Sequence, residues 1–556
     1  MTTDPFQFSD PILAQLLRTT SPEALRAKMN AMAQSLGDAS FGLRIAGEMV
    51  KRTRPQAAVP EIYGHFRDLV RDGIEFFLSR IDRSRLVDLV ASQLRMDPRA
   101  DARERLLEMA KRFPTLHKLG QIIARNPHID PDVKQWLIHL ENDRYGTPDT
   151  GLVKRVRQQL KRTDSLDKVQ VRSTILAEAS VGAVIPFAGT PCAGPDTIDG
   201  VFKILKPGIR RQVREELAVL KETAAFFQRN RARYPLQDFK FLAVFDEVGD
   251  MLVKEVDLVA EQAHLAEAAV FYGGMPAVRI PALLPMCTDT MTAMDFLDGP
   301  KIIDADLTPE QRRQCAGVLF EALVCRPLFS PGENALFHGD PHAGNILAVP
   351  APGSGTPRIG LVDWSLAGRL TRRDRVDIVR LIQAIVKQDL TGIRVAVTAL
   401  AGGGSRGEAG RLRTEVLAFM HTAEFGGMSL MRKAFQLLER LSYIGFVFPA
   451  DLMLFRKAIF TLEGVLNDLW PDFDMDAAVL QYLTGLMVRE MPQRFAGLLF
   501  PLADRPENYP SMISNMELQS LALHQYATIL SAMTRAFGDS FTAWNRLFGT
   551  SLPLCM

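Results

Sequence analysis

Residues 338–345 read His-Gly-Asp-Pro-His-Ala-Gly-Asn, and residues 358–364 read Arg-Ile-Gly-Leu-Val-Asp-Trp. Short apolar runs at 345–349 and 358–363 flank a loop rich in Pro and Gly at 350–357, which predicts a β-hairpin. Phosphoryl transfer from ATP needs an Asp that accepts or orients the attacking hydroxyl, and an Asn and a second Asp that hold Mg²⁺. The spacing from His338 to Asn345, followed by an Asp at the end of a strand, is typical of that arrangement.

These residues give the first candidate site. We interpret Asp340 as the catalytic base, and Asn345 and Asp363 as ligands of Mg²⁺, a hard cation that prefers oxygen donors. Each residue singly would also fit an Asp-Pro turn or a capped strand end. The complete set at this spacing favours the interpretation as a phosphoryl-transfer site.

A second group of residues lies upstream, on a predicted strand and in the loop before it. Lys203 follows a Gly-rich hairpin loop, and a lysine on such a strand pairs the α- and β-phosphates in kinase-like folds. Residues 177–182 read Ala-Glu-Ala-Ser-Val-Gly, at the place where a kinase has its glycine-rich phosphate cover. The candidate phosphate contacts in this loop are Ala177, Ala179 and Ser180. The alternative is an edge-strand lysine that points to water beside an ordinary turn.

Three further motifs extend the candidate nucleotide site. Glu255, on the helical run after Lys203, is predicted to hold that lysine by a charge-assisted hydrogen bond. Lys118 and Gln121 lie three positions apart and share one face of a predicted helix. Met294 lies in a segment whose position fits the strand and hinge between two lobes, where backbone groups would meet adenine. Taken singly, the charged positions fit solvated helix faces better than a nucleotide site.

Composition places the chain among ordinary multidomain globular proteins. It has 556 residues, of which 47% are hydrophobic and 23% charged, and its formal net charge is 66 − 64 = +2. A net charge so close to zero gives no general attraction for polyanions, so we expect no nucleic-acid partner. The five cysteines are scattered without a C-x-x-C pair, which argues against a disulfide scaffold and fits a reducing compartment.

Helical periodicity dominates both ends of the chain, and most predicted strands lie in the middle. Helices are expected at 210–229 and 236–269, and strands at 173–176, 181–187, 200–205, 277–280, 289–296, 345–349 and 358–363. We divide the chain into an N-terminal helical extension (1–110), a helical segment around Lys118 (111–165), an N-lobe with an antiparallel sheet and a helical insert (166–299), a C-lobe with the catalytic and metal-binding loops (300–476), and a C-terminal helical tail (477–556).

No stretch has the pattern of a signal peptide or a membrane-spanning helix. The first ten residues contain two acids and no basic or apolar region, and no run of about 18 apolar residues occurs. We therefore expect a cytoplasmic protein that touches a membrane only peripherally. Residues 477–500 would suit an interfacial helix, although packing against the core explains the same pattern.

The motifs together resemble those of the UbiB/AarF family of atypical protein-kinase-like proteins. That family carries, in order, a K-x-G-Q helix, an Ala-rich loop, a strand lysine, an E-x-D motif, an H/D-x-D-x-x-x-x-N loop and a D-F-G triplet. The matching positions here are Lys118–Gln121, Ala177–Ser180, Lys203, Glu255–Asp257, Asp340 with Asn345, and Asp363. The resemblance runs from about Phe113 to Asp476.

The resemblance implies an α+β, predominantly helical, protein-kinase-like fold of two lobes, with an N-terminal helical extension packed over the active-site cleft. It implies ATP and Mg²⁺ as cofactors and a slow ATPase or unorthodox kinase activity, in support of isoprenoid-quinone or lipid metabolism at a membrane surface. The implied partners are ATP and a lipid or isoprenoid-quinone precursor. The K-x-G-Q helix of the family covers the active site and disfavours protein substrates.

Three departures from the family pattern leave alternatives open. The family's Gly-Gln-Val-His is Gly-Ala-Val-Ile at 182–185, its D-F-G is Asp-Trp-Ser at 363–365, and its Ala two places before the lysine is Val201. The second hypothesis is a small-molecule phosphotransferase of the aminoglycoside/choline kinase type, but it gives no reason for the motifs at Lys118 and Glu255. The last two changes motivate a third hypothesis, a pseudokinase scaffold that binds nucleotide or lipid.

Overall fold

The structure is a computed structural model of the chain. It describes residues 22–97, 99–124, 130–138, 150–165, 168–190, 197–234, 241–351, 353, 355–402, 409–422 and 425–499, and several short stretches between 504 and 519. These residues divide into two compact units. Unit 1 spans residues 1–262 and 283–296, and unit 2 spans 263–282 and 297–556.

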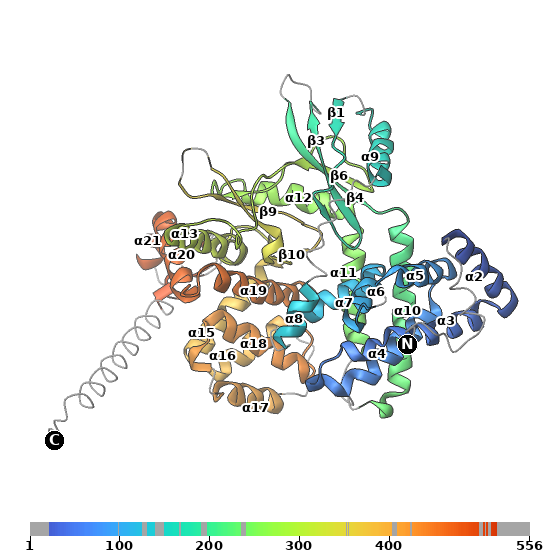
Figure 1. Cartoon of the computed structure of the whole chain (residues 1–556). Coiled ribbons are helices and arrows are strands. Elements are labelled where there is room, and N and C mark those ends of the chain that lie inside the picture. The colour runs from blue at the N-terminus through green and yellow to red at the C-terminus, as the bar shows by residue number, and fades with distance from the viewer. Residues whose placement is uncertain are drawn as a thin grey trace, which may run out of the picture. The chain divides into compact units, whose positions relative to one another are not determined.

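Helices make up most of unit 1 (Figure 1). They are α2 (Pro22–Leu36), α3 (Asp38–Thr53), η1 (Pro55–Ala58), η2 (Glu61–Phe66), α4 (Arg67–Arg80), α5 (Arg83–Arg95), α6 (Ala102–Lys111), α7 (Pro114–Ala124), α8 (Pro131–Ile138), α9 (Thr150–Arg162), α10 (Ile209–Arg229), η4 (Arg231–Arg233) and α11 (Phe241–Glu255). Side chains at the starts fix several of these ends. Asp82 caps α5, and Asp101 forms a capping box with Glu104 at α6.

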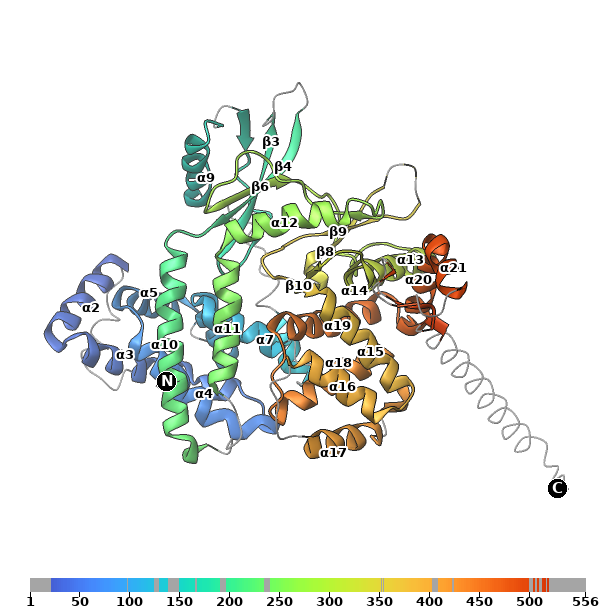
Figure 2. The same cartoon turned by 180° about the vertical axis from the view of Figure 1, so that it is seen from behind.

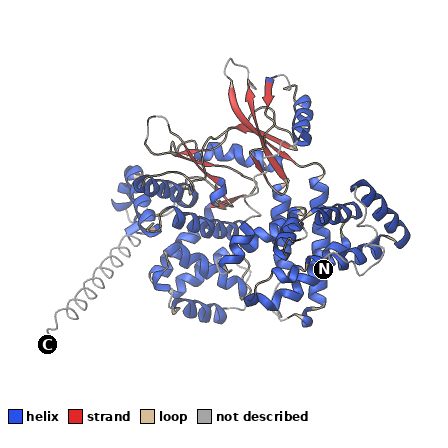
Figure 3. Ribbon diagram, viewed as in Figure 1, coloured by secondary structure: helices blue, strands red, loops and turns tan. Residues whose placement is uncertain are grey.

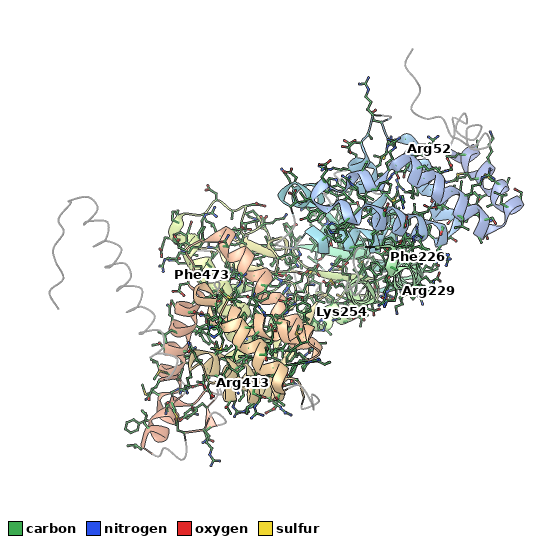
Figure 4. The ribbon with its side chains drawn as sticks, turned by 90° about the horizontal axis from the view of Figure 1, so that it is seen from below. Arg52, Phe226, Arg229, Lys254, Arg413 and Phe473 are labelled. Atoms are coloured by element: carbon green, nitrogen blue, oxygen red, sulfur yellow. The ribbon has the colours of Figure 1, made fainter. Side chains whose placement is uncertain are left out.

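The first helices of unit 1 share one core with α10. Phe41, Phe77 and Phe113 are buried together in a cluster that also takes in Val219 from α10. The ring of Phe226, which Figure 4 labels, belongs to α10. It stacks on the ring of Phe76 of α4 with centroids 4.7 Å apart. The predicted N-terminal helical extension is therefore present, and its apolar faces pack against α10.

A five-stranded sheet forms the other part of unit 1 (Figure 3). It contains β1 (Val169–Val171), β2 (Ala177–Glu178), β3 (Gly182–Gly189), β4 (Ile198–Leu205) and β6 (Met291–Asp295). The strands pair in the order β1-β3-β4-β6, and β2 pairs with β3. All these pairs are antiparallel. Helix α9 lies beside the sheet and shares its core, since Val156 and Leu160 are buried with Phe187 and Phe202 (Figures 1 and 2).

Unit 2 is also mainly helical. Its helices are α13 (Pro309–Phe320), η5 (Glu321–Cys325), α14 (Arg326–Phe329), η6 (Ala343–Asn345), α15 (Arg372–Val386), α16 (Leu390–Leu400), α17 (Ala409–Met420), η7 (Phe425–Gly427), α18 (Leu430–Tyr443), α19 (Ala450–Leu469), α20 (Met475–Arg489) and α21 (Met491–Leu499). Helix α12 (Leu258–Tyr272) begins in unit 1 and continues into unit 2. In the core, Phe455 of α19 meets Phe435 and Phe337 edge to face.

Two small sheets of unit 2 carry the candidate catalytic loops. β7 (Asn334–His338) pairs with β10 (Ala367–Thr371). β8 (Ile346–Val349) and β9 (Arg358–Leu361) form the predicted hairpin, with Ile346 opposite Leu361, and β5 (Val278–Arg279) joins β9 in parallel. This hairpin places the ends of its two strands, at Asn345 and Val362, next to each other.

Two predicted elements are wrong. Residues 173–176 form no strand, since β1 ends at Val171 and β2 begins at Ala177. The helix expected at 236–269 is broken at Val256 and Asp257, where Asp257 accepts the backbone N–H of Ala260 and caps a new helix, α12. Among the described helices, none is long and apolar enough to cross a membrane.

Candidate functional site

The loop after β7 is held together by the ring of His338. Nδ1 of His338 accepts the backbone N–H of Asp340 at 3.2 Å, and Nε2 lies 3.1 Å from the carbonyl oxygen of Val362. With these partners, Nε2 carries the proton and donates it to Val362. Burial lowers the pKa of His338, so the ring is neutral near pH 7 and keeps this hydrogen-bonding pattern. His338 thereby ties the loop of Asp340 to the end of β9.

Asn345 adds two more hydrogen bonds between the same segments. Its Nδ2 donates to the carbonyl oxygen of Asp340 at 3.1 Å, and its own carbonyl oxygen accepts the N–H of Val362 at 3.0 Å. Because Nδ2 faces Asp340, the amide oxygen Oδ1 points the other way, and Oδ1 is the atom that binds a hard cation. The structure therefore joins the three predicted segments of unit 2 into one hydrogen-bonded loop.

Asp363 follows β9 in an unusual backbone conformation. Its φ is 59°, one of four positive values at non-glycine residues in the described chain. This left-handed conformation costs roughly 1–2 kcal/mol and is found preferentially at functional sites. It ends the strand and turns the carboxylate out of the strand direction, where Oδ1 accepts the N–H of Ser365 at 3.3 Å.

Trp364, the residue in place of the family's Phe, is fully buried behind Asp363. Its indole meets the ring of His338 edge to face at 4.7 Å, and Nε1 donates to the carbonyl oxygen of Leu361 at 3.3 Å. The carbonyl oxygen of Trp364 lies 3.1 Å from Nδ1 of His264 on α12. The larger ring thus fits its site through specific contacts, and hydrogen bonds fix the residues on either side of Asp363, which are Val362 and Trp364.

Asp340 has a histidine neighbour in its own loop. Nε2 of His342 lies 4.0 Å from Oδ2 of Asp340, and Nδ1 of His342 accepts the N–H of Gly344 at 3.0 Å. That bond places the proton of a neutral His342 on Nε2, the atom that faces Asp340. A carboxylate with a donor on one side and a fixed loop on the other suits the orientation of a hydroxyl or a water.

In unit 1, Lys203 lies on β4 as predicted, but its acidic partner is not the predicted one. Nζ of Lys203 donates to Oε1 of Glu261 at 2.6 Å, and both side chains are largely buried, with 17% and 4% exposed. The prediction that Glu255 holds Lys203 is therefore wrong. The break between α11 and α12 places Glu261 in the first turn of α12, while Glu255 ends α11.

Glu255 pairs instead with Lys118, which lies on the predicted helix, now α7. Lys118 is buried, and Gln121, one turn on, lies with Nε2 3.3 Å from Nε2 of His117. The two lysines of the candidate site thus use two different acids, Glu255 and Glu261, from the two sides of one helix break. Sequence spacing alone could not separate these partners, because both acids lie near the same junction.

The predicted phosphate cover is the turn between β2 and β3. Ala177 lies in β2, and the N–H of Ala179 donates to the carbonyl oxygen of Gly182 at 2.8 Å, which closes the turn around Ser180. Glu178 pairs with Lys206 at 2.7 Å and ties this turn to the end of β4. Met294 lies on β6 opposite Val201, and unit 1 ends two residues later.

Glu261 is the functional residue that the sequence reasoning missed. The available signal was Asp257, a residue type that caps helices, followed four positions later by an acid. An acid in the first turn of a helix is favoured by the helix dipole, so a new helix start there would have pointed to Glu261. His338 and Val362 join the catalytic loop to β9. The sequence motifs contain His338 but do not predict this contact.

The donor set in unit 2 fits Mg²⁺. Asn345 and Asp363 offer an amide and a carboxylate oxygen, and Mg²⁺ is bound by few protein oxygens together with waters and phosphates. Among the described residues, no group of three or more His, Cys, Asp and Glu side chains could hold a metal ion.

Comparison with known proteins gives a consistent picture. Residues 170–397 match the model of the ABC1 atypical kinase-like domain. Two similar proteins are the probable protein kinase UbiB of Pseudomonas paraeruginosa, 24% identical over 391 residues (67% of this chain and 69% of that protein), and that of Xanthomonas campestris pv. campestris, 25% identical over 398 residues (69% and 70%).

A plant protein and a solved structure also match. The chloroplastic protein ACTIVITY OF BC1 COMPLEX KINASE 1 of Arabidopsis thaliana is 23% identical over 384 residues, which cover 68% of this chain and 54% of that protein. The solved structure of Rv3197 from Mycobacterium tuberculosis in complex with erythromycin is 17% identical, with a TM-score of 0.37, and covers 63% of this chain and 90% of that one.

The chain thus contains an atypical protein-kinase-like domain, in a predominantly helical α+β protein with small sheets and an N-terminal helical region. This match and the similarity to the two UbiB proteins agree with the family resemblance that the motifs indicate.

Proposed function

We propose that this protein binds ATP with Mg²⁺ and hydrolyses it, or transfers its γ-phosphoryl group slowly to an acceptor. The observation that carries the proposal is the set of hydrogen bonds, through His338 and Val362, that joins the loop of Asp340 and Asn345 to the end of β9, directly before Asp363. The Lys203–Glu261 pair in unit 1 supports it, because phosphoryl-transfer enzymes of this fold use such a lysine.

Each residue has a distinct role in this proposal. Lys203, kept in place by Glu261, neutralises the α- and β-phosphates, and Asn345 and Asp363 supply oxygens to the metal. Bound Mg²⁺ would neutralise charge on the phosphates. Asp340 orients the attacking water or hydroxyl and accepts its proton, while neutral His338 holds the loop and takes no part in the proton transfer. The motif at Lys118, paired with Glu255, supports the site from α7.

A binding measurement tests the proposal. Isothermal titration calorimetry of the full chain with ATP should show saturable binding that is stronger with Mg²⁺ than with EDTA. Thermal unfolding should shift upward with ligand concentration as expected for a ligand of the native state. The variant Lys203→Met should lose most of this binding, whereas Asp472→Asn, which changes an exposed acid in unit 2, should retain it. Absence of ATP binding by the parent chain would refute the proposal.

The scaffold alternative remains the second candidate because of Trp364 and Val201. Trp364 fills the site behind the metal ligand, and Val201 is buried opposite Met294 on the predicted adenine side. ATP binding without any Mg²⁺-dependent release of phosphate would favour a pseudokinase. Release of phosphate at a steady rate would favour the enzyme, and a fast rate with an aminoglycoside or choline acceptor would favour the small-molecule phosphotransferase.

We further propose a role close to a membrane, in isoprenoid-quinone or lipid metabolism. Helices α20 and α21 expose a group of large apolar side chains, and such exposed groups mark sites of interaction with proteins or membranes. They are Met487, Val488, Met491, Phe495, Leu498 and Leu499. Leu483 and Leu486 of α20 are buried, so one face packs on the core and the other is exposed. Flotation with anionic and zwitterionic liposomes tests this. Co-flotation that is lost in Phe495→Glu is expected, and no flotation with either lipid would contradict it.

A further inference from the structure

A buried acid on α10 joins three segments of unit 1. Oε2 of Glu216 accepts the backbone N–H of Thr115 at 3.0 Å and its hydroxyl at 2.6 Å, and Oε1 pairs with Arg85. The Glu216 side chain is fully buried, and that of Arg85 is 15% exposed. A buried carboxylate is stable only where it is paired and hydrogen-bonded. Glu216, Thr115 and Arg85 therefore depend on one another.

The partners of Glu216 come from elements with different roles. Arg85 belongs to α5 of the N-terminal extension, where its guanidinium also lies over the ring of Phe113 at 4.8 Å. Thr115 lies in the first turn of α7, whose N–H groups have no partner within the helix. Helix α7 has no acid of its own in that turn, and Glu216 supplies one from α10. The start of α7 is thereby fixed.

Further contacts lead from the start of α7 to Lys203, the predicted phosphate-binding lysine. One turn after Thr115, Lys118 pairs with Glu255 at the end of α11. Arg210 of α10 donates to the carbonyl oxygen of Val256 at 3.1 Å, in the break between α11 and α12. Asp257 then caps α12, and one turn on Glu261 holds Lys203. An ion pair thus joins α7 to the end of α11, the chain itself leads through the break to α12, and a second ion pair joins α12 to β4.

We propose that Glu216, together with Arg85, is a positioning residue of the nucleotide site. By fixing the start of α7 it places Lys118 against Glu255, and the break at residues 255–257 then places Glu261 against Lys203. The N-terminal extension therefore acts on the phosphate-binding lysine through Arg85. The proposal rests on the proposed ATP binding only for its functional readout, since the contacts themselves lie wholly within unit 1.

The same two regions offer a matched control. Arg80 of α4 pairs with Glu222 of α10 at 2.6 Å, and both side chains are about half exposed. This pair also joins the N-terminal extension to α10, but no hydrogen bond links it to the described residues of α7. Glu222→Gln thus breaks an ion pair between the same two regions while leaving the start of α7 intact.

Hydrogen–deuterium exchange of the full chain without nucleotide tests the positioning role. In Glu216→Gln, amides of residues 256–262 should exchange about 3- to 30-fold faster, the size of typical coupling between distant sites. Thr115→Val, which removes only the hydroxyl donor, should give a smaller increase at the same residues and serves if Glu216→Gln does not fold. Glu222→Gln should leave them unchanged. Faster exchange at α7 with no change at 256–262 would overturn the proposal.

A double-mutant cycle on ATP affinity gives the functional readout. Glu216→Gln should weaken ATP–Mg²⁺ binding about 3- to 30-fold when Lys118 is present and less than about twofold in the Lys118→Met background, because the effect passes through Lys118. Equal weakening in both backgrounds would overturn the proposal. If the parent chain binds no ATP, the proposed function fails, while the exchange experiment still decides whether Glu216 positions the break at 255–257.

Discussion

At the scale of single residues, local motifs predict the candidate site residues better than they predict the side chains with which those residues pair. The loop of Asp340 and Asn345 is hydrogen-bonded to Val362, the residue before Asp363, and motifs can predict this because only a β-hairpin separates the two segments. The partner of Lys203 lies 58 residues away, so its identity depends on tertiary placement. The sequence motifs therefore predict the position of Lys203 on its strand, but they predict Glu255 as its partner where the structure has Glu261.

The two acids make a testable contrast. Glu261→Gln removes the charge of the acid that pairs with Lys203. We expect kcat/KM for ATP to fall about 10- to 100-fold, since a hydrogen bond to a charged group contributes about 1.5–3 kcal/mol. Steady-state ATPase kinetics measure this. Glu215→Gln, on the exposed side of α10, is the control and should be neutral. A large loss of kcat/KM in Glu255→Gln with none in Glu261→Gln would show that Glu255, and not Glu261, supports Lys203.

At the scale of elements, strands with clear turn signals and the bounds of α10 were predicted, whereas the break between α11 and α12 was not. The hairpin of β8 and β9 and the strand of Lys203 follow from alternation and from Pro- and Gly-rich loops. The break between α11 and α12 was missed because apolar residues continue at helical spacing across Val256, so periodicity alone cannot show where a capping side chain ends one helix and starts another.

An acid at a helix start in unit 2 gives a prediction of pH dependence. Asp476, in the first turn of α20, accepts the N–H of Leu430 at the start of α18 at 3.0 Å, and burial raises its pKa to about 6. An acid whose folded pKa is raised binds more protons in the native state than in the unfolded state between about pH 4 and 6. Its contribution to stability is therefore lost as the pH rises through that window.

Asp476→Asn keeps an oxygen acceptor for Leu430 but cannot ionise. The difference in free energy of unfolding between this variant and the parent chain should move in favour of the variant by about 2 kcal/mol between pH 4 and pH 7. Urea unfolding across this range measures the difference. A difference that does not change with pH would show that Asp476 has an ordinary pKa in the native state.

At the scale of the whole molecule, the predicted class of fold is confirmed, and the packing of the N-terminal helices on α10 was not foreseen. Composition and motif order indicate a helical α+β protein with kinase-like parts, because such features are encoded along the chain. Glu216 joins the N-terminal extension to α7 through contacts with Thr115, which is 101 positions away in sequence, and Arg85, which is 131 positions away. No local sequence pattern reveals contacts at such separations.

The central claim is that Asn345 and Asp363 hold a nucleotide-bound metal beside Asp340. The most direct measurement is the rate of Mg²⁺-dependent ATP hydrolysis by the parent chain and by Asp363→Asn, with circular dichroism to confirm that the fold is kept. We expect a loss of about a hundredfold or more, since even outer partners of metal ligands account for 10- to 100-fold. An Asp363→Asn variant that hydrolyses ATP at the parent rate, with the same Mg²⁺ dependence, would contradict the account.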